Sequence, residues 1–310
     1  MTDGKAGTEN PCLGLAEAMG LEPVVKRIRL RTPWRQLSPL LRPGARYSFS
    51  PSGDRIQPPW PDILITSGRA AVMAALAMRQ QNPGTFVVHV QDPRISARHF
   101  DAVIVHGQDR IRGPNVIVIT GALTRVTPQR LEEAAARFRD SLTGIPSPRV
   151  AVLVGGSSRV WRMTPAVMGK LVEQLQALVR DQGVGLMVTA SRRTGEENAT
   201  ILRQGLKGLP GTVLWDGQGD NPLFGYLGLA DAVIVTGDSI SMLSEACSTG
   251  KPVYIVDLKG GSEKFRAFHR TLYAGGYAQP FTGQAAFGPA PQLDDTALTA
   301  AEVWRRYREK

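Results

Sequence analysis

One stretch of the chain, residues 230–258, constrains the fold more than any other. It reads ADAVIVTGDSISMLSEACSTGKPVYIVDL, and its pattern runs strand, turn, helix, glycine stop, strand. Residues 232–236 form a short β-branched run that is typical of a buried parallel strand. A Gly-Asp-Ser turn at residues 237–239 supplies a helix cap, and Gly250 ends the helix before residues 253–256. This unit predicts an α/β fold with a parallel sheet.

Glu245 is unusual within this stretch, because it lies two turns inside the predicted helix. That helix opens at the carboxyl end of a buried strand, where open α/β sheets bind their ligands. A carboxylate there can accept two hydrogen bonds from a diol such as a ribose. The free N–H groups at the helix start, beside Asp238, Ser239 and Ser241, can hold a phosphate. A solvated or capping glutamate is the alternative interpretation.

Strands alternate with helices along both halves of the chain, which predicts parallel sheets with right-handed crossovers. The predicted strands are residues 61–66, 85–90, 102–105, 116–120, 149–154, 185–189, 211–215, 232–236 and 253–256. The predicted helices are residues 13–19, 70–81, 128–142, 165–182, 196–205 and 294–308.

A Pro-rich stretch at residues 144–148 separates the two arrays. We therefore expect an N-terminal domain over residues 1–146 and a C-terminal domain over residues 147–310. Both are expected to be Rossmann-like and to face a central cleft, with the last helix packing back on the N-terminal domain.

The start of the chain departs from this pattern. Residues 2–7 look like the turn after a first strand, and a helix is predicted soon afterwards, yet only Met1 precedes the turn. A central strand is therefore missing from the pattern, and we expect the true start to lie further upstream.

The composition limits the class of partner. Lys and Arg number 37 against 27 Asp and Glu, so the formal net charge is +10. The basic residues are scattered, and no basic motif interleaved with aromatic residues and no helix-turn-helix pattern occurs, so we expect no nucleic-acid partner. The charge is compatible with phosphate binding and with peripheral contact to an anionic membrane.

The cysteines and histidines indicate neither a disulfide framework nor a metal site. Cys12 and Cys247 lie far apart, and the four histidines have no metal-ligand spacing. No apolar run approaches the ~18–20 residues that cross a bilayer, and no signal segment opens the chain. We expect a cytoplasmic protein, whose charge also permits contact with the cytoplasmic face of the inner membrane.

Two further strand ends of the second domain carry groups that suit a diphosphate. Gly155, Gly156, Ser157 and Ser158 follow the strand at residues 149–154. Paired glycines and hydroxyls at such a position can cradle a phosphate, although turn chemistry alone also explains them. Ser191 and Arg193 follow the next strand, and this arginine can pair with a diphosphate. Three consecutive crossovers therefore predict one ligand site.

The first domain offers the groups that could act as a general base. Deprotonation of an acceptor hydroxyl requires His, Asp or Glu. Asp3, Asp92, His106 and Asp109 follow turns or predicted strands and are the catalytic candidates. For each of them a capping or turn role is the alternative, most clearly for Asp92, which precedes a proline.

Several motifs in one order resemble a known family. They are DGKAGTENPCLGLAEAMG, SGRAAVMAAL, VQDPRISARHFDAVIVHGQDRIRGPNVIVITGAL, VGGSS, ASRRTGEEN and VTGDSISMLSEACSTGKPVYI. Together they resemble the bacterial relatives of the plant mitochondrial-fission factor whose loss elongates mitochondria. The resemblance covers nearly the whole chain. That family is sometimes labelled a nucleoside-diphosphate-sugar epimerase.

More distantly, the second domain resembles the donor half of GT-B glycosyltransferases. The resemblance implies that Gly155, Gly156 and Ser157 meet the diphosphate and that Glu245 holds the nucleotide ribose. Two departures stand out. The family has a strand before the DGK loop, and its relatives carry a Pro-x-His-Asp-like element where this chain has residues 105–109. The absence of an Asp-x-Asp motif agrees with metal-independent chemistry.

These observations predict a glycosyltransferase that uses a nucleotide-diphosphate sugar as substrate and holds no tightly bound cofactor. The second domain would bind the donor. The first would bind an envelope-type acceptor, which a membrane could carry, and would supply the base. One alternative is a nucleotide-sugar epimerase, which needs no acceptor. The other is a non-catalytic, membrane-peripheral adaptor related to organelle fission.

Overall fold

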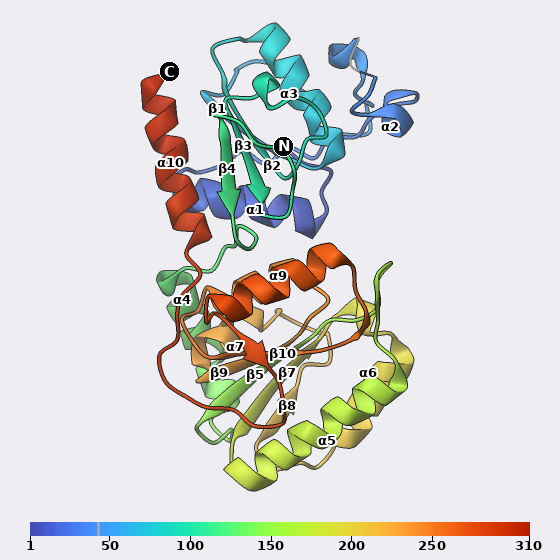
Figure 1. Cartoon of the computed structure of the whole chain (residues 1–310), viewed down its shortest axis with the longest axis vertical. Coiled ribbons are helices and arrows are strands. Elements are labelled where there is room, and N and C mark those ends of the chain that lie inside the picture. The colour runs from blue at the N-terminus through green and yellow to red at the C-terminus, as the bar shows by residue number, and fades with distance from the viewer. Residues whose placement is uncertain (42–43) are drawn as a thin grey trace. The chain divides into compact units, whose positions relative to one another are not determined.

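The computed structural model describes residues 1–41 and 44–310, which divide into two compact units (Figure 1). Unit 1 comprises Met1–Arg125 and Asp294–Lys310, and unit 2 comprises Val126–Leu293. Each unit has a sheet of parallel strands with helices packed on it. The α/β class with parallel sheets, as predicted, is confirmed.

Unit 1 is built on a parallel sheet in the order β1–β2–β3–β4. Its strands are β1 (Ile63–Ser67), β2 (Phe86–Val90), β3 (Ala102–His106) and β4 (Val116–Ile119). Its helices are α1 (Ala6–Ala18), α2 (Trp34–Leu37), α3 (Arg69–Gln81) and α10 (Asp295–Glu309), with the short 3-10 turns η1 (Ala45–Tyr47) and η2 (Ala97–His99).

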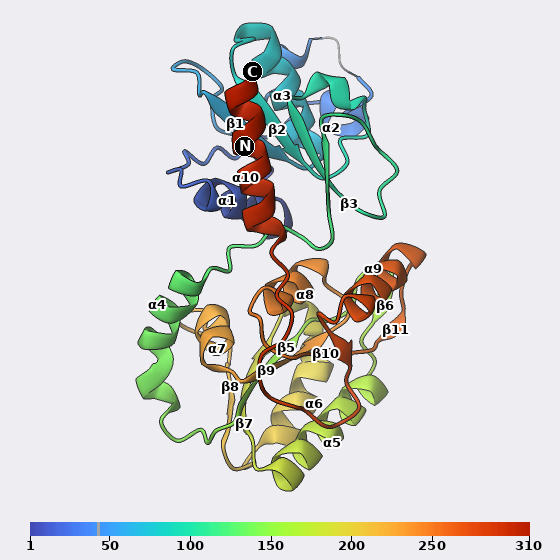
Figure 2. The same ribbon diagram turned by 60° about the vertical axis from the view of Figure 1, so that its left-hand side comes forward.

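Both faces of this sheet are covered, which explains why its strands are apolar without alternation. Helix α3 packs on one face through Val72 and Met73. Helices α1 and α10 lie side by side on the other face (Figures 1 and 2), where Leu15 and Val303 share one apolar cluster. The indole N–H of Trp304 also donates to the carbonyl of Met19 over 3.0 Å. The last helix is therefore part of unit 1.

Unit 2 contains a longer parallel sheet in the order β12–β10–β9–β5–β7–β8, with a two-stranded antiparallel ribbon of β6 and β11 beside it. Its strands are β5 (Arg149–Val154), β6 (Trp161–Arg162), β7 (Gly185–Ala190), β8 (Thr212–Leu214), β9 (Ala232–Thr236), β10 (Val253–Val256), β11 (Lys259–Gly260) and β12 (Gln279–Pro280). Its helices are α4 (Pro128–Arg139), α5 (Pro165–Gln182), α6 (Glu196–Leu206), α7 (Leu223–Leu229), α8 (Ile240–Cys247) and α9 (Glu263–Ala274), with turns η3 (Asp140–Leu142) and η4 (Arg192–Thr194).

Successive side chains of β5 point to opposite faces of the sheet, so this strand contributes to the core on both sides of unit 2. Val150 and Val152 face the cluster that α5 and α6 cover. Ala151 and Leu153 face the opposite cluster, which α7, α8 and α9 cover. Because helices cover both faces, β5 and its neighbour β9 are buried along their length and position the turns that follow them.

The division between the units falls earlier than the predicted boundary at residue 146. Helix α4 belongs to unit 2, because it packs closely on α7. Gly225 and Gly228 make this approach possible, since a Cβ atom on them would lie 2.5 Å from Phe138 and from the carbonyl oxygen of Leu131, respectively. The Pro-rich stretch that suggested the boundary is a connection inside unit 2.

The local predictions differ from the structure mainly where sequence periodicity is weak. Helix α1 begins at Ala6 rather than at residue 13, because Gly7 and Pro11 hide its helical pattern. The sequence analysis did not predict the short helix α7, helix α9 or the β6–β11 ribbon. Thr127 caps α4, because its hydroxyl accepts the N–H of Arg130 over 3.1 Å.

Candidate functional site

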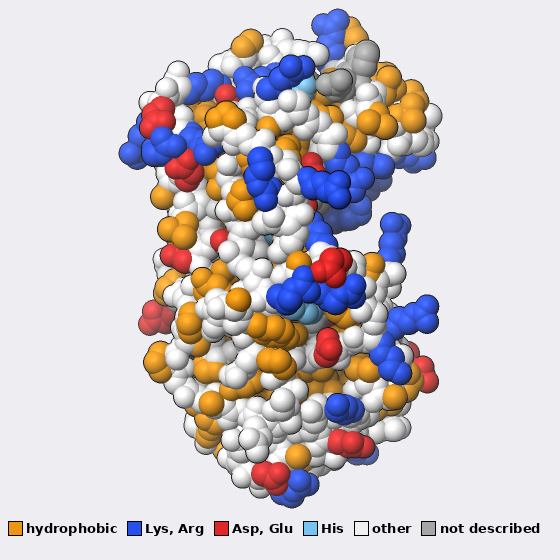
Figure 3. Space-filling view, in the orientation of Figure 1, with side chains coloured by type: hydrophobic (Ala, Val, Ile, Leu, Met, Phe, Trp, Pro, Cys, Tyr) orange, Lys and Arg blue, Asp and Glu red, His pale blue; other side chains and the backbone are white. Residues whose placement is uncertain are grey.

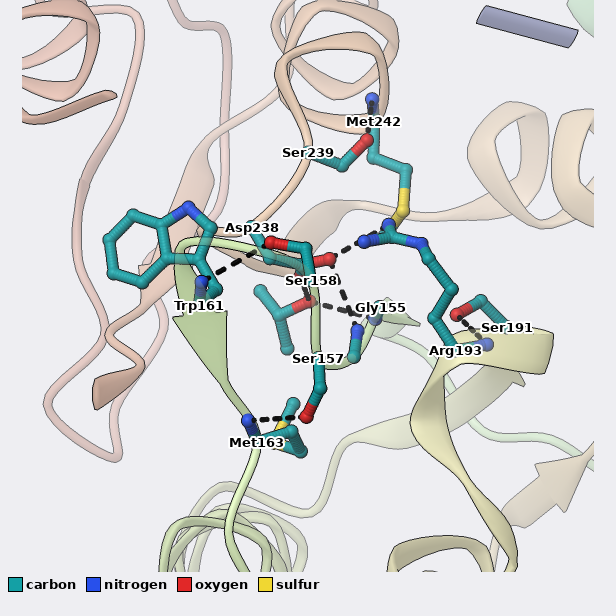
Figure 4. Close-up of polar contacts among 12 residues, drawn as sticks. Gly155, Ser157, Ser158, Trp161, Met163, Ser191, Arg193, Asp238, Ser239 and Met242 are labelled. Atoms are coloured by element: carbon teal, nitrogen blue, oxygen red, sulfur yellow. Dashed lines mark hydrogen bonds and ion pairs between the residues drawn. The ribbon is translucent and has the colours of Figure 1, made fainter. Parts of the chain in front are cut away.

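The candidate site lies at the carboxyl edge of the unit 2 sheet. Strands β9, β5 and β7 are neighbours there, so the turns that follow them meet (Figure 4). The structure brings together the two glycines and two serines after β5, the Ser191–Arg193 turn after β7, and Asp238 and Ser239 after β9. These residues are far apart in the sequence. They come together because β9, β5 and β7 are adjacent and parallel in the sheet.

The carboxylate of Asp238 is the centre of this cluster. Its side chain is fully buried, and it accepts the hydroxyl proton of Thr236 over 2.6 Å and the N–H of Gly156 over 3.1 Å. It also forms a 2.8 Å ion pair with Arg193, whose side chain is 42% exposed. A buried charge is tolerated when it is paired and hydrogen-bonded in this way. Asp238 therefore fixes the position of an arginine that still reaches solvent.

The paired glycines are required by close packing. A Cβ atom on Gly155 would overlap the carboxylate of Asp238, and one on Gly156 would overlap the carbonyl oxygen of Arg193. Both glycines thus allow the turns after β5, β7 and β9 to touch. This packing explains the Gly-Gly pair without a ligand.

The amides of this loop are already bonded within the protein. The N–H of Gly155 donates to the hydroxyl of Thr236 over 2.8 Å, and that of Ser157 donates to the Arg193 carbonyl over 3.1 Å. The hydroxyl oxygens of Ser157 and Ser158 accept the N–H groups of Met163 and Trp161, respectively (Figure 4). An anion at this loop would therefore meet hydroxyl protons and the arginine rather than a nest of free amides.

The start of α8 offers free amides instead. Ser239 caps this helix as predicted, because its hydroxyl accepts the N–H of Met242 over 3.3 Å. Within the described chain, the N–H groups of Ile240 and Ser241 have no protein acceptor. Free amides and the helix dipole make this end of α8 suitable for an anion.

Glu245 is a buried carboxyl group in the same helix, only 9% exposed. No hydrogen bond to its carboxylate is found among residues 1–41 and 44–310. Burial without a compensating partner raises its pKa to about 7. The alternative reading as a solvated glutamate is therefore wrong.

Two residues beneath the β9–α8 turn, His269 and Trp161, are not predicted from the sequence. A ring nitrogen of His269 on α9 lies 2.9 Å from the Gly237 carbonyl, and its ring stacks on Trp161 at 5.8 Å. A Cβ atom on Gly237 would come within 2.8 Å of the His269 ring. Burial lowers the pKa of His269, which favours the neutral imidazole. Neither aromatic residue stands near the turn in sequence, so no local pattern marks them.

Each of the four catalytic candidates of unit 1 takes part in a hydrogen bond within a turn. Partial burial alone would raise the pKa of Asp3, but hydrogen bonds from Lys5 and Thr8, both 2.7 Å, outweigh it and lower that pKa. Asp92 accepts the N–H of Arg94 over 2.8 Å, where Arg94 has a positive φ of 56°. These are the turn roles that the alternative interpretation predicted.

His106 ends β3, and Asp109 lies in the turn that follows it. The carboxylate of Asp109 accepts the backbone N–H of His106 over 3.1 Å.

None of the helices in the described chain is long and apolar enough to cross a bilayer. Among the described residues, no group of three or more His, Cys, Asp or Glu side chains is placed to hold a metal ion.

Two parallel α/β units of this kind define a GT-B-like fold. MurG from Acinetobacter baumannii superposes with a TM-score of 0.51 at 14% identity, and the match covers 98% of each chain. The UDP-GlcNAc 2-epimerase from Methanocaldococcus jannaschii superposes with a TM-score of 0.50 at 13% identity, over 78% of this chain and 69% of that one. At these identities the likeness concerns the fold alone.

Within this class, the chain belongs to the family described as Mitochondrial fission ELM1, which it matches over residues 6–307. The resemblance stated from the sequence motifs is confirmed. The Mitochondrial fission protein ELM1 of Arabidopsis thaliana is 30% identical over 272 residues, and the match covers 79% of this chain. The uncharacterized protein RP120 of Rickettsia prowazekii is 25% identical over 231 residues, and the match covers 63% of this chain. The matches cover 64% of the length of each of these relatives.

Proposed function

We propose that unit 2 binds a nucleotide-diphosphate sugar and that the chain is a glycosyltransferase of the GT-B type. The proposal goes beyond family membership and fold. It rests on how the carboxyl edge of the unit 2 sheet combines a fixed arginine, a helix start with two free amides and a buried carboxylate.

The buried carboxylate of Glu245 carries this proposal. A carboxylate in an apolar setting without donors is unfavourable, and a ligand that supplies donors removes that penalty. The two hydroxyl groups of a ribose are donors of this kind. Glu245 lies in α8, whose first turn has free N–H groups, so one helix would hold both the ribose and the diphosphate.

Arg193 and the start of α8 would stabilise the leaving nucleoside diphosphate. Positive groups that are already in place when charge develops on a leaving group contribute strongly to catalysis. Asp238 already neutralises part of the Arg193 charge. The incoming diphosphate would share this guanidinium with Asp238, with the Ile240 and Ser241 amides supplying the remaining donors.

Unit 1 would bind the acceptor and supply the general base from among Asp3, Asp92, His106 and Asp109. An envelope-type acceptor carried by a membrane would suit the positive charge of the chain. On the face that Figure 3 shows, described Lys and Arg side chains are spread over both units instead of gathering over one element. Such a surface would give a weak, salt-sensitive attraction to anionic lipids.

Thermal unfolding with added nucleotides tests the donor site. The full chain is heated with UDP, GDP, ADP and their sugar derivatives. A ligand at 100 times its Kd should add about 2.7 kcal/mol, which raises the Tm by several degrees. We expect the nucleotides of one base to raise the Tm in this way, and we expect Glu245→Ala to reduce that rise. Glu197→Ala is the matched control, because Glu197 is an exposed carboxylate on α6. An unchanged shift in Glu245→Ala would refute the ribose assignment.

Turnover assays then separate the alternatives. Conversion of the sugar by donor alone would identify an epimerase, whereas transfer requires an acceptor. If no nucleotide shifts the Tm, the adaptor hypothesis replaces the proposal. Sedimentation with anionic vesicles at low and high salt then tests that hypothesis.

A further inference from the structure

The two-stranded ribbon beside the unit 2 sheet carries two positive charges directly opposite each other. In the antiparallel pairing of β6 with β11, Arg162 is the partner of Lys259, and Trp161 is the partner of Gly260. Directly opposite residues have their side chains on the same face, with Cβ atoms about 5 Å apart. Arg162 and Lys259 are exposed, whereas Trp161 is turned inward and is 2% exposed. The outer face of the ribbon therefore presents two adjacent cations.

The protein itself does not compensate these two charges. Like charges directly opposite each other destabilise a ribbon. In the part of the chain that the structure describes, no carboxylate lies within ion-pair distance of Arg162 or Lys259. Glu263, which follows β11, pairs with two arginines of its own helix. Asp257, two residues before Lys259, is exposed, and its charge acts on His269 of α9. An anionic ligand would remove the repulsion.

The backbone of the ribbon is fixed from beneath by α9, beside which β6 and β11 lie (Figure 2). Trp161 packs edge-on against Phe265 at 5.7 Å and stacks on His269 at 5.8 Å. Gly261 has a positive φ of 90°, and a Cβ atom on it would lie 2.7 Å from the Trp161 ring. Its N–H donates to the Val160 carbonyl over 2.6 Å. The backbone that carries both cations is therefore ordered before a ligand binds, which lowers the entropic cost of binding.

A tight turn joins the ribbon to the loop after β5. The hydroxyl oxygen of Ser158 in this loop accepts the N–H groups of Val160 and Trp161 over 3.3 and 3.2 Å, respectively (Figure 4). Arg159 is exposed in the same turn, and within the described residues its side chain has no hydrogen-bond or ion-pair partner. Positive charge therefore gathers next to the candidate nucleotide site without being part of the cluster around Asp238.

We propose that the outer face of the ribbon binds a phosphomonoester, at a site separate from the nucleotide site of unit 2. A phosphomonoester carries about −1.5 to −2 charges at pH 7 and three acceptor oxygens, so one group matches two adjacent cations. A carboxylate carries one charge and would compensate only one of them. A membrane surface or a nucleic-acid backbone needs many cations over a wide area, whereas Figure 3 shows Lys and Arg side chains spread over both units. The geometry therefore favours a discrete, doubly charged ligand such as a sugar phosphate.

Calorimetric titration of the full chain with glucose 1-phosphate at physiological ionic strength tests this site. The double variant Arg162→Gln, Lys259→Gln removes both cations. We expect it to raise the Kd at least about tenfold, because charge-assisted hydrogen bonds to the phosphate are lost. The matched control is Lys170→Gln, Lys207→Gln, which removes the same charge from exposed positions elsewhere on unit 2. Since salt screens distant charges, the control should leave the Kd within about twofold of the parent value.

The other outcomes separate this site from the nucleotide site and from a membrane. Equal weakening in the two double variants would show an effect of net charge alone and would overturn the proposal. Saturating UDP should leave the Kd for glucose 1-phosphate unchanged, and competition between the two ligands would overturn the separate site. Absence of glucose 1-phosphate binding also overturns it, even if vesicles of phosphatidic acid sediment with the protein. A parent that binds glucose 1-phosphate but no nucleotide would support this site and contradict the donor site alone.

Discussion

At the scale of single residues, two buried carboxylates of unit 2 differ in their surroundings. Asp238 accepts hydrogen bonds from Gly156 and Thr236 and pairs with Arg193, so its charge is compensated inside the protein. Glu245 lacks such partners in the described chain, and its pKa is raised to about 7. The first carboxylate joins three turns of the candidate site, and the second is the one to which we assign donors from a ligand. Their different surroundings support different roles.

Glu245 makes the stability of the chain depend on pH. Between its ordinary pKa of 4.5 and about 7, the folded protein keeps the proton that the unfolded chain releases, so stability falls as pH rises. The total loss is about 3 kcal/mol, complete above the raised pKa. Glu245→Gln cannot ionise and should escape this loss. Urea unfolding of both proteins at pH 5 and pH 8 should show the variant gaining on the parent, and an equal difference at both pH values would contradict the assignment.

The capping residues of unit 2 show what sequence can predict at this scale. Ser239 could be assigned as the cap of α8 because a cap acts on amides two or three residues away. The pair of Asp238 and Arg193 joins two crossovers, and His269 reaches Gly237 from α9. These contacts depend on the order of strands in the sheet, which a single sequence does not encode locally.

At the scale of elements, the turn after β5 depends on the close approach of its two glycines to the neighbouring turns. Gly156 lies against the carbonyl of Arg193 in the turn after β7, and the neighbouring Gly155 lies against Asp238 in the turn after β9. The sequence analysis placed these turns at one edge because parallel strands share their direction. It could not predict that the loop amides are used internally, since that follows from the contact between turns.

A pair of glycine substitutions tests this contact. Gly156→Ala should destabilise the chain by about 3 kcal/mol, because the new methyl group overlaps a backbone oxygen that cannot move alone. Gly169 is the matched control, since a Cβ atom there meets nothing within 4 Å and the residue lies inside α5. Gly169→Ala should stabilise by ~0.5–1 kcal/mol through helix propensity. Chemical denaturation measures both, and similar effects of the two substitutions would refute the contact.

At the scale of the whole molecule, the division into units differs from the division read from the sequence. The Pro-rich stretch at residues 144–148 has the composition of a linker, yet α4 before it packs on α7 after it. Phe138 meets Tyr226 edge-on at 6.4 Å in this interface. The proline content of a segment indicates only how stiff the chain is locally. The boundary of a unit depends on which distant elements pack together, and the sequence of the segment does not show this.

Excised fragments test the boundary. Residues 126–293 should fold alone, unfold cooperatively and keep any nucleotide-dependent shift in Tm, because they contain the complete unit 2. Residues 147–293 lack α4 and would expose the apolar face of α7, so they should unfold at a markedly lower temperature or aggregate. Circular dichroism and gel filtration compare the two fragments. Equal stability would show that α4 contributes nothing to unit 2.

The pairing of α1 with α10 has a consequence for biosynthesis. A ribosome releases the chain from its amino end, so α1 emerges first, whereas α10 follows only after the whole of unit 2 has been made. Until then the apolar surface of α1 around Leu15 and Met19 lacks the helix that covers it. Unit 2 can therefore mature before unit 1, which must wait until α10 has been made and has left the ribosome. During that interval the nascent protein presents an unfinished surface that chaperones would be expected to shield.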